Sequence, residues 1–472
     1  MNIYGAEAAR QRKRMLLALA LVVACAIGII IGRWLVFYQY PILESTSFRN
    51  LSYTYDKIMD DYLEGAESHA LINGAAEGMV ASLGDPYSVY LTGEKGEDYM
   101  KSYEDHFVGI GVEIRQQDGD YIIENATLGS PAEKAGLQHG DIVRAVDNKS
   151  VKGMAFDQLL KLVKGKEGTK VTLIIDREKV AEPLAVTVER GTVPVHTLSY
   201  EMKGDHIGMI VISRFADKTG EEFDQAIAAL KEKGMQRLLL DLRSNPGGLL
   251  EPTIHIANTF VPKGKTIVQV VNKDERRIVT HTSEQAEAWK LPLAILVDSH
   301  TASSAEVLTA ALKETAGAEV IGERTFGKGI VQQFRQLPDG SVLKLTEAQW
   351  RSPDGQWIHK KGIEPTIAVA PPDYTQLSPI AAGKKLQEGD YGQRVEAAQN
   401  LLQALGYSTG PAIGIYSKEM RETVQLFQRQ QGIPETGELN DRTAYEISRR
   451  LLEKYKAEDP QMKKALEVLQ AK

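Results

Sequence analysis

The chain has a single cysteine, Cys25, in 472 residues. One thiol excludes disulfides, zinc fingers and iron–sulfur clusters within the chain, so hydrophobic cores must hold the fold together. The sequence also lacks a His-Glu-x-x-His segment and the paired His/Asp spacings typical of metal enzymes. We therefore predict no metal and no cofactor.

The chain also has fewer basic than acidic residues. Lys and Arg number 56 against 63 Asp and Glu, which gives a formal net charge of −7. Proteins that bind nucleic acid need a basic surface, so this balance excludes nucleic acid as a partner. Apolar residues (43%) and charged residues (25%) occur in ordinary globular proportions. The length allows about three domains.

One long apolar run stands near the start of the sequence. Residues 15–32 carry no charge, and a helix rising about 1.5 Å per residue would span about 27 Å there, close to the thickness of a bilayer core. Basic residues at 10–14 precede the run, and aromatic residues at 34–40 follow it, as at a membrane interface. The positive-inside rule then puts residues 1–14 in the cytoplasm and everything beyond an anchor at 15–36 outside.

Two alternatives compete with an uncleaved membrane anchor. A signal peptide would have a shorter apolar region and small residues before its cut site, and no such site follows Gly32. Cys25 ends the segment Leu-Val-Val-Ala-Cys, which has the outline of a lipoprotein cleavage site. The apolar run continues beyond Cys25, however, where a lipoprotein would turn polar. We therefore expect a single-pass anchor, and lipidation of Cys25 stays an open alternative.

The rest of the sequence predicts a multidomain α/β (α+β) protein. Apolar residues at spacings of three and four predict a helical region at 44–104, and 105–190 is typical of a β-rich module with two short helices. Strands alternate with helices through 191–370, which indicates an α/β core with a partly parallel sheet. Three further segments follow: a linker at 371–385, a small helical unit at 386–453 and a charged tail at 454–472.

Short apolar runs in the core region mark its strands, and the stretches between them mark its helices. We predict strands at 206–212, 237–242, 293–297 and 319–321. We predict helices at 221–233, 252–260 and 302–315.

Three segments of this core could carry chemistry. Residues 297–306 read Val-Asp-Ser-His-Thr-Ala-Ser-Ser-Ala-Glu and place small hydroxyl residues at a helix N-terminus, where backbone N–H groups can stabilise an oxyanion. Residues 322–332 read Gly-Glu-Arg-Thr-Phe-Gly-Lys-Gly-Ile-Val-Gln and hold a lysine where the backbone can turn tightly. Residues 238–250 end a buried strand in Asp-Leu-Arg-Ser-Asn-Pro-Gly-Gly-Leu-Leu. Taken singly, the first segment is as well explained by helix capping and the second by a solvated loop.

Together the three segments resemble the carboxyl-terminal processing proteases, also called tail-specific proteases, a serine peptidase family that uses a Ser–Lys dyad. The family pattern combines Asp-Leu-Arg-x-Asn-x-Gly-Gly, Ser-Ala-Ser-Ala-Ser-Glu and Thr-Phe-Gly-Lys-Gly-x-Val-Gln. The first and third stretches are present in full, and the lysine follows the nucleophile position by 25 residues. The second stretch departs from the pattern at Thr301, Ser304 and Ala305, so a second hydroxyl stands beside the nucleophile position at Ser303.

The resemblance implies a role for each matching residue. Ser303 would be the nucleophile, Lys328 the general base, and Gln332 the residue that orients the lysine amine. The backbone N–H groups of Gly248 and Ser304 would form the oxyanion hole. The dyad needs a neutral lysine, and burial can lower the usual lysine pKa of about 10.4 by up to about 3–5 units.

Two other chemistries are suggested by single motifs. His300 and Asp298 lie near Ser303, but all three crowd one turn, whereas a Ser–His–Asp triad draws its members from separate elements. Gly322 to Lys328 matches the start of a nucleotide-binding P-loop, but Gly329 stands where the Ser or Thr that holds Mg²⁺ is required. We therefore favour the Ser–Lys dyad over both alternatives.

The module at 105–190 resembles a PDZ domain, which binds the C-termini of peptides. Residues 130–137 and the Gly140-Asp141 pair fit this resemblance. Arg177, at the end of a strand, would be a residue that couples the PDZ domain to the active site. The resemblance also implies a loop that binds the peptide carboxylate, formed by Phe107, Val108, Gly109, Ile110 and Gly111. Such a loop points backbone amides at the carboxylate while the peptide adds a strand to the sheet edge.

The helical unit at 386–453 resembles a small three-helix peptidoglycan-binding domain. Most of the matching positions are apolar or glycine, so the sequence does not single out the carbohydrate contacts. The matching residues are Gly389, Gly392, Val395, Gln399, Leu402, Leu405, Gly406, Thr423, Val424, Phe427, Gln428, Gly437 and Thr443.

The sequence as a whole predicts a membrane-anchored, extracytoplasmic serine endopeptidase. Its expected partners are proteins with exposed C-terminal tails, peptidoglycan, the membrane through one N-terminal helix, and a second copy of the chain through helices at 44–104. The alternative is a non-catalytic scaffold that binds peptide tails and the cell wall but forms no acyl-enzyme.

Overall fold

The computed structural model describes residues 3–101, 106–117, 119–204, 206–287, 289–381 and 383–472. Residues 102–105, where we expected the PDZ domain to begin, and residue 382, in the expected linker, lie outside the described residues. The chain divides into two units, Met1–Gly93 with Gln336–Lys344, and Glu94–Arg335 with Leu345–Lys472. The mixed helix and strand content confirms the multidomain α/β (α+β) fold class.

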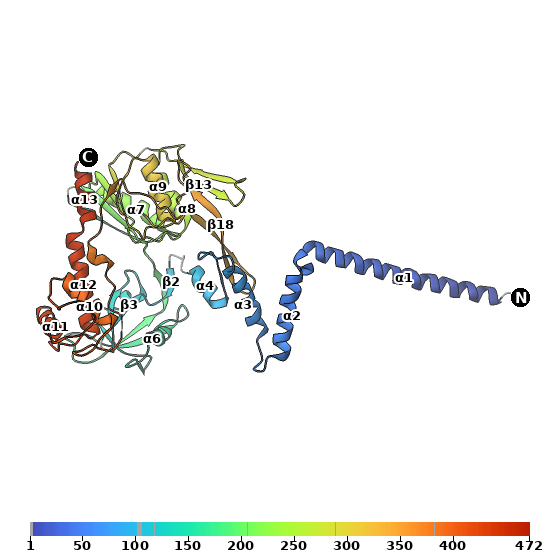
Figure 1. Cartoon of the computed structure of the whole chain (residues 1–472), viewed down its shortest axis with the longest axis horizontal. Helices are drawn as coiled ribbons and strands as arrows, with labels where there is room; N and C mark the ends of the chain where they lie inside the picture. Colours follow the sequence, from blue (N-terminus) through green and yellow to red (C-terminus); the bar gives the residue numbers. More distant parts are fainter. Residues whose placement is uncertain (1–2, 102–105, 118, 205, 288, 382) are drawn as a thin grey trace. The chain divides into compact units, whose positions relative to one another are not determined.

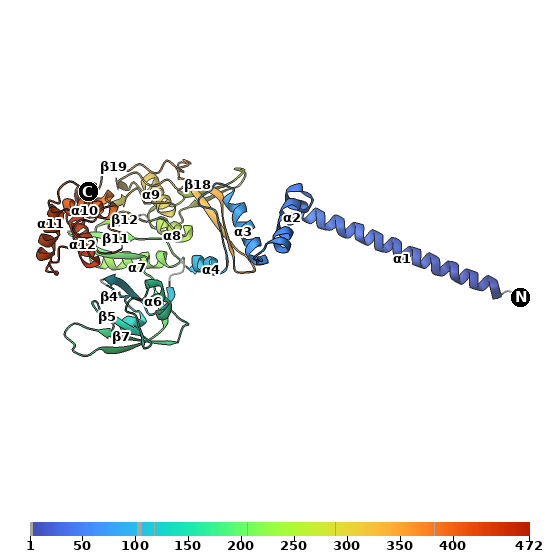
Figure 2. The same ribbon diagram turned by 60° about the horizontal axis from the view of Figure 1, so that its bottom comes forward.

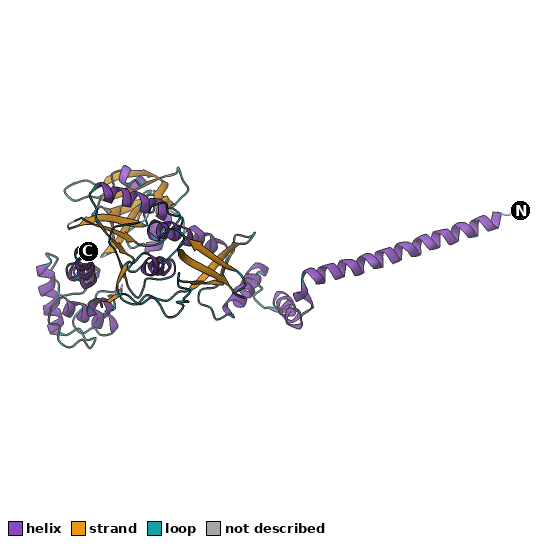
Figure 3. Cartoon of the chain, turned by 90° about the horizontal axis from the view of Figure 1, so that it is seen from above, coloured by secondary structure: helices purple, strands orange, loops and turns teal. Residues whose placement is uncertain are grey.

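The first unit begins with the long helix α1 (Ile3–Gln39), drawn in Figure 3 as one continuous helix. Within it, Met15–Gln39 contains an 18-residue window with a mean hydropathy of 2.9, and none of that window is buried in the protein. A helix of this length and composition is compatible with the expected single-pass anchor and also with a signal sequence.

The remainder of the first unit is mostly helical, as predicted. A short 3-10 helix (Pro41–Glu44) leads into α2 (Thr46–Asp61), which has no buried residue, and then into α3 (Ser68–Ala81). The next element is strand β1 (Val89–Leu91), which was not predicted from the sequence. It pairs antiparallel with Val342–Lys344 at the start of β18 (Val342–Arg351).

The second unit opens with helix α4 (Gly93–Lys101) and then a β-rich module, in which β4, β5 and β7 are labelled in Figure 2. Its six-stranded sheet has the order β3-β4-β5-β7-β8, and the sixth strand, β6, pairs with β5. Its buried core includes Ile123, Leu159 and Val171, from two strands and a helix. Strand β2 (His106–Gly109) pairs antiparallel with β9 (Gly191–Pro194). The other elements of this module are β3 (Val112–Gln117), β4 (Asp120–Ala126), α5 (Pro131–Lys134), β5 (Ile142–Val146), β6 (Lys149–Ser150), α6 (Phe156–Val163), β7 (Lys170–Asp176) and β8 (Leu184–Glu189).

The α/β core contains a six-stranded sheet in the order β10-β11-β12-β15-β16-β19. Strands β10 and β11 are antiparallel, and all other neighbours are parallel, which confirms the partly parallel sheet. The strands are β10 (Leu198–Lys203), β11 (Ile207–Ile212), β12 (Arg237–Asp241), β15 (Leu293–Val297), β16 (Glu319–Gly322) and β19 (Ile367–Ala368).

Helices cover both faces of this sheet (Figure 1). Successive side chains of a strand point to opposite faces, so Leu238 and Leu240 pack toward α7 (Thr219–Glu232), α8 (Leu250–Phe260) and α9 (Ser304–Thr315). Leu239 packs on the other face, which is covered by α13 (Pro460–Gln470). The segment expected as a charged tail thus supplies one layer of the core.

The remaining elements of the second unit form a smaller sheet and a helical domain. Strand β13 (Thr266–Asn272) pairs with β14 (Ile278–Thr282) and with Ala348–Arg351 of β18, and β17 (Ile330–Gln336) also pairs with β18. A 3-10 helix (Asp373–Gln376) lies in the expected linker. Helices α10 (Gln393–Ala404), α11 (Lys418–Gln430) and α12 (Asp441–Glu458) then enclose their own core, which agrees with the predicted three-helix domain.

Candidate active site

A pocket of about 160 Å³ lies where loops leave the carboxyl ends of β12, β15 and β16. These strands are parallel neighbours, so the loops that follow them emerge at one edge of the sheet. All five residues for which the sequence predicted catalytic or oxyanion roles line this pocket: Ser303, Lys328, Gln332, Gly248 and Ser304.

The backbone at Ser303 has an uncommon conformation. Its φ is +55° and its ψ is −120°, in a region that side-chain-bearing residues rarely adopt. Such strain is found at functional sites where the surrounding structure enforces it. Ser303 is the N-cap residue of α9, and its backbone N–H donates to the Glu306 side chain as in a capping box.

The neighbouring hydroxyl is engaged in a different contact. Ser304 Oγ donates a hydrogen bond to the carbonyl oxygen of Gly248 at 2.9 Å. This bond joins the first turn of α9 to the Gly-Gly loop, so the second hydroxyl has a structural partner. Of the two serines, Ser303 has the geometry that better suits a nucleophile.

The two glycines after β12 are required by close packing. Gly248 has a φ of +148°, and a Cβ there would overlap the carbonyl oxygen of Phe215. A Cβ on Gly247 would lie 2.8 Å from the Cβ of Ser303. Among the described residues, the backbone N–H groups of Gly248 and Ser304 donate no hydrogen bond. Two donors at the edge of the pocket can therefore serve an oxyanion.

A buried carboxylate, missed as a functional residue by the sequence analysis, joins two of the loops. Glu306 Oε2 accepts hydrogen bonds from the backbone N–H groups of Ser303 (2.9 Å) and Lys328 (2.8 Å). Its Oε1 accepts from the N–H of Gly327 (2.7 Å) and from the hydroxyl of Thr325. Burial raises the pKa of Glu306, and these hydrogen bonds oppose the rise. The Ser-x-x-Glu spacing of a capping box is the sequence signal that could have found it.

The loop that carries Lys328 is held from its other side. The indole Nε1 of Trp350 donates to the carbonyl oxygen of Lys328 at 2.9 Å, and Trp357 Nε1 donates to that of Gly329 at 2.7 Å. The Lys328 residue is half-buried. A Cβ on Gly329 would lie 2.7 Å from the backbone nitrogen of His359, so the glycine permits this close packing.

Gln332 contributes an unsatisfied polar group to the pocket. Its Nε2 is buried and has no hydrogen-bond partner among the described residues. A buried amide without a partner is costly, which points to a group that pairs with it during function.

The residues of the alternative triad have other roles. The Asp298 carboxylate accepts hydrogen bonds from the backbone N–H groups of Ser244, His300 and Thr301, so it organises a turn. His300 is exposed. In the part of the chain that the structure describes, no group of three or more His, Cys, Asp or Glu side chains could hold a metal ion.

The predicted peptide-binding loop is only partly a loop. Phe107, Val108 and Gly109 lie in β2 and pair with β9, and Ile110 and Gly111 connect β2 to β3. Phe107 and Val108 are exposed, whereas the other three residues are buried. The strand pairing was not foreseen because the partner strand comes more than eighty residues later in the sequence.

Arg177 makes its contacts within the β-rich module. Its Nε and Nη2 donate to Oδ1 and Oδ2 of Asp141 at 2.7 and 2.8 Å, and Nη2 also donates to the carbonyl oxygen of Gly136 at 2.7 Å. This bidentate pair ties the end of β7 to the segment before β5. A coupling role for Arg177 stays a prediction.

Comparison with known protein families assigns four regions of the chain. Residues 206–369 match the peptidase family S41, and residues 122–177 match a PDZ domain. Residues 391–447 match a peptidoglycan-binding domain, and residues 40–95 match the N-terminal domain of the activating protease CtpB.

Individual relatives are similar over nearly the whole length. The chain is 40% identical to "Carboxy-terminal processing protease CtpA" of Bacillus subtilis over 424 residues, 90% of each chain. It is 36% identical to a "Probable CtpA-like serine protease" of Staphylococcus aureus, over 90% of this chain and 86% of the relative. The solved "Photosystem II D1 C-terminal processing protease" is 27% identical, with a TM-score of 0.41, over 69% of this chain and 87% of that one. The chain therefore belongs to peptidase family S41, among the carboxy-terminal processing serine proteases that carry a PDZ domain.

Proposed function

We propose that this protein is a membrane-anchored, extracytoplasmic endopeptidase that cleaves protein tails through a Ser303–Lys328 dyad and an acyl-enzyme. One observation carries the proposal: Ser303, Lys328, Gln332, Gly248 and Ser304 line a single pocket. The strained backbone of Ser303 supports its role as the nucleophile.

In the proposed reaction, neutral Lys328 Nζ takes the proton from Ser303 Oγ as that oxygen bonds to the carbonyl carbon of the peptide. The N–H groups of Gly248 and Ser304 donate to the resulting oxyanion. The lysine then gives the proton to the leaving amine as the C–N bond breaks. In the deacylation step, Lys328 takes a proton from water as the water oxygen bonds to the acyl carbon, and it returns the proton to Ser303 Oγ as the ester bond breaks. Gln332 orients the lysine amine.

The other domains would select and locate the substrate. The PDZ domain captures an exposed C-terminal tail, with Ile110 and Gly111 at the loop that receives its carboxylate. The three-helix domain binds peptidoglycan and so holds the enzyme at the cell wall. Residues 15–36 cross the membrane, with residues 1–14 in the cytoplasm and the catalytic part outside.

The proposal includes a homodimer formed through residues 44–104. Its support is that α2 has no buried residue and exposes Leu51, Tyr53 and Met59. Sedimentation of the full chain in detergent tests it. A dimer that Leu51→Glu dissociates supports the arrangement, and a monomer at all concentrations contradicts it.

The catalytic proposal is tested with the full-length protein in detergent micelles. Casein and a peptide with an apolar C-terminus serve as substrates, and a fluorophosphonate probe reports the nucleophile by mass spectrometry. We expect the adduct on Ser303, no cleavage by Ser303→Ala or Lys328→Ala, and reduced but clear cleavage by Ser304→Ala.

Two outcomes would contradict the proposal. Cleavage that survives Lys328→Ala would rule out the dyad, because no other base is assigned to the reaction. A wild-type protein that binds tails but forms no adduct and cuts nothing would establish the non-catalytic scaffold instead.

A further inference from the structure

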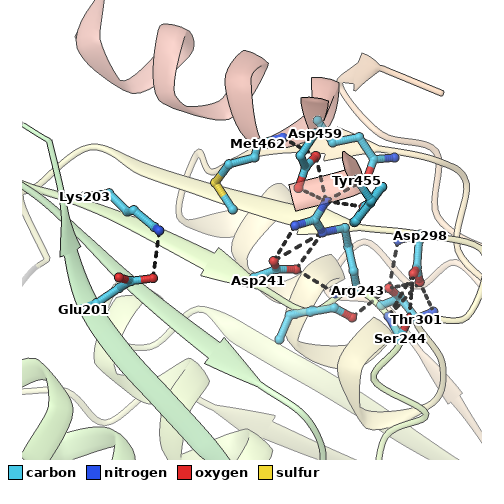
Figure 4. Close-up of polar contacts among 12 residues, drawn as sticks. Glu201, Lys203, Asp241, Arg243, Ser244, Asp298, Thr301, Tyr455, Asp459 and Met462 are labelled. Carbon is cyan, nitrogen blue, oxygen red and sulfur yellow. Dashed lines mark hydrogen bonds and ion pairs between the residues drawn. The ribbon is translucent and has the colours of Figure 1, made fainter. Parts of the chain in front are cut away.

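Arg243 lies between two buried carboxylates that come from distant parts of the chain (Figure 4). Its Nη2 donates to Oδ2 of Asp241 at 2.7 Å, and its Nη1 donates to Oδ2 of Asp459 at 2.8 Å. The Arg243 side chain is 13% exposed, and those of Asp241 and Asp459 are 8% and 9% exposed. Charges this buried are stable only when they stay paired, so the three side chains form one unit.

The C-terminal helices provide one side of this cluster. Tyr455 Oη, near the end of α12, accepts a hydrogen bond from Arg243 Nη1 at 3.0 Å, and Gln461 Oε1 accepts another at 3.2 Å. Asp459 also caps α13 by accepting from the N–H of Met462 at 2.9 Å. The cluster therefore fixes the point where α12 ends and α13 begins.

Both helices are anchored by packing on either side of this point. Helix α13 buries Ala465 and Leu469 completely against the core sheet. Helix α12 starts in the three-helix domain, where Ile447 is fully buried. A single helix thus runs from the core of that domain to the side chains that hold Arg243.

The loop beyond Arg243 leads directly to the active-site pocket. Ser244, with a φ of +57°, donates its N–H to Asp298 at 2.9 Å. The carbonyl oxygen of Asn245 accepts from the N–H of Ala302 at 2.9 Å, and Asn245 Oδ1 accepts from the N–H of Gly247 at 2.8 Å. Displacement at Arg243 would therefore be transmitted to Gly248 and to the segment before Ser303.

We propose that Asp459, supplied by the C-terminal helices, is a positioning residue of the protease, and that it acts through Arg243 on the loop 244–248 that carries the Gly248 oxyanion donor. The inference rests on the proposed function of that loop. It makes the end of α12 and helix α13 part of the catalytic unit.

The test is Asp459→Asn in the full-length protein, because the amide keeps the shape of the carboxylate and removes its charge. We expect kcat for a tail peptide to fall by about 10- to 100-fold, since a small misplacement of catalytic groups costs about that much. KM should change little, and the rate of fluorophosphonate labelling of Ser303 should fall in parallel with kcat. Asp459→Glu, which keeps the charge, should recover most of the activity.

Two further variants keep the test decisive. Lys464→Gln removes an exposed ion pair with Glu467 on the same helix α13 and should leave kcat unchanged. Tyr455→Phe removes a single hydrogen-bond acceptor and keeps the ring, so it should fold even if Asp459→Asn does not, and should lower kcat by a few-fold.

The outcomes separate the two proposals. Suppose that the wild type is labelled and cleaves the peptide while Asp459→Asn keeps full kcat. The positioning role is then wrong and the proposed protease function stands. If Asp459→Asn does not fold, Tyr455→Phe takes its place, and full kcat in that variant has the same meaning. If the wild type neither labels nor cleaves, the proposed function fails, and the positioning role fails with it.

Discussion

Ser303 and Lys328 donate their backbone N–H groups to the same carboxylate oxygen, Oε2 of Glu306, at 2.9 and 2.8 Å. The two residues lie on loops that follow different strands, β15 and β16. Because one atom accepts from both, the separation of the two loops is fixed by a side chain that carries out no chemistry itself. Glu306 is thus a positioning residue of the proposed dyad, beside Gln332.

Replacement of Glu306 by Gln should disrupt this arrangement. All four partners of the carboxylate are donors, so the amide NH₂ of glutamine must face two of them on either orientation. We expect a loss of about 1–3 kcal/mol in the free energy of unfolding and a fall in kcat of about 100-fold. Urea unfolding and peptide cleavage measure the two effects.

Lys313→Gln on the same helix is the matched control for Glu306→Gln. Its Nζ donates to the carbonyl oxygen of Glu364, away from the pocket. A surface change of this kind should alter the unfolding free energy by no more than about 0.5 kcal/mol. Equal effects of the two substitutions would contradict the role of Glu306.

Protonation of Glu306 should lower kcat at acid pH, in addition to the loss that protonation of the general base Lys328 causes. Burial raises the pKa of Glu306 above the ordinary value of 4.5. As pH falls through this raised pKa, the carboxyl group gains a proton and turns an O–H toward backbone N–H donors, which disturbs both loops. A profile of log kcat against pH, measured between pH 4 and 8, should therefore steepen from a slope of about 1 to a slope of about 2 as the second group is protonated. A slope that stays at about 1 down to pH 4 is the result that this explanation does not allow.

The raised pKa of Glu306 also makes the free energy of unfolding depend on pH, in the direction opposite to kcat. The pKa of Glu306 is higher in the folded state than in the unfolded chain. Its contribution to the free energy of unfolding is therefore complete below pH 4.5, the ordinary pKa, and is lost as pH rises through the folded-state pKa. Subtracting urea-unfolding curves of Glu306→Gln from those of the wild type at several pH values isolates this contribution. A difference that does not vary with pH would show that the pKa is not raised.

Gly248→Ala should abolish most of the activity without any loss of the nucleophile. The added Cβ would overlap the carbonyl oxygen of Phe215, and its φ of +148° is unfavourable for alanine. The loop must then move away from the pocket, and we expect kcat to fall by about 100-fold or more. Gly74→Ala, in helix α3 with nothing within 4 Å of the new Cβ, should leave kcat unchanged and stabilise its helix by about 0.5–1 kcal/mol.

Leu469→Ala tests whether α13 belongs to the core. Leu469 is fully buried on the sheet, so the truncation should lower the free energy of unfolding by about 2–5 kcal/mol. Leu452→Ala on α12 removes the same atoms from a side chain that is 52% exposed. Thermal unfolding of the two variants makes the comparison, and similar melting temperatures would mean that α13 is only loosely attached.

Local sequence patterns predicted much of the fold and the candidate site. The apolar run at 293–297 coincides with β15, and the predicted helix at 252–260 lies within α8, because both are short segments with a clear hydrophobic pattern. The residues proposed for catalysis lie in three short motifs at the ends of strands. Motifs of this kind keep their spacing and local geometry, so their meeting in one pocket could be anticipated.

Features that depend on distant parts of the chain could not be predicted in this way. Asp459 contacts Arg243 across 216 residues, and no pattern near either residue indicates the other. Charged and apolar residues are equally frequent in 454–472, so the composition of this segment did not reveal that its apolar positions pack on the sheet. Strand β1 has only three residues and is formed by its pairing with β18, so it carries no periodic signal of its own.

The position of α13 in the chain has a consequence for the timing of synthesis. Every strand of the core sheet is made before residues 460–470, so the second face of the sheet stays uncovered while the three-helix domain is being completed. Domains made early can fold early during translation, but this catalytic core cannot be finished in that order. A newly made chain would therefore stay an unfinished protease until the domain proposed to bind the wall, and helix α13 after it, have been synthesised.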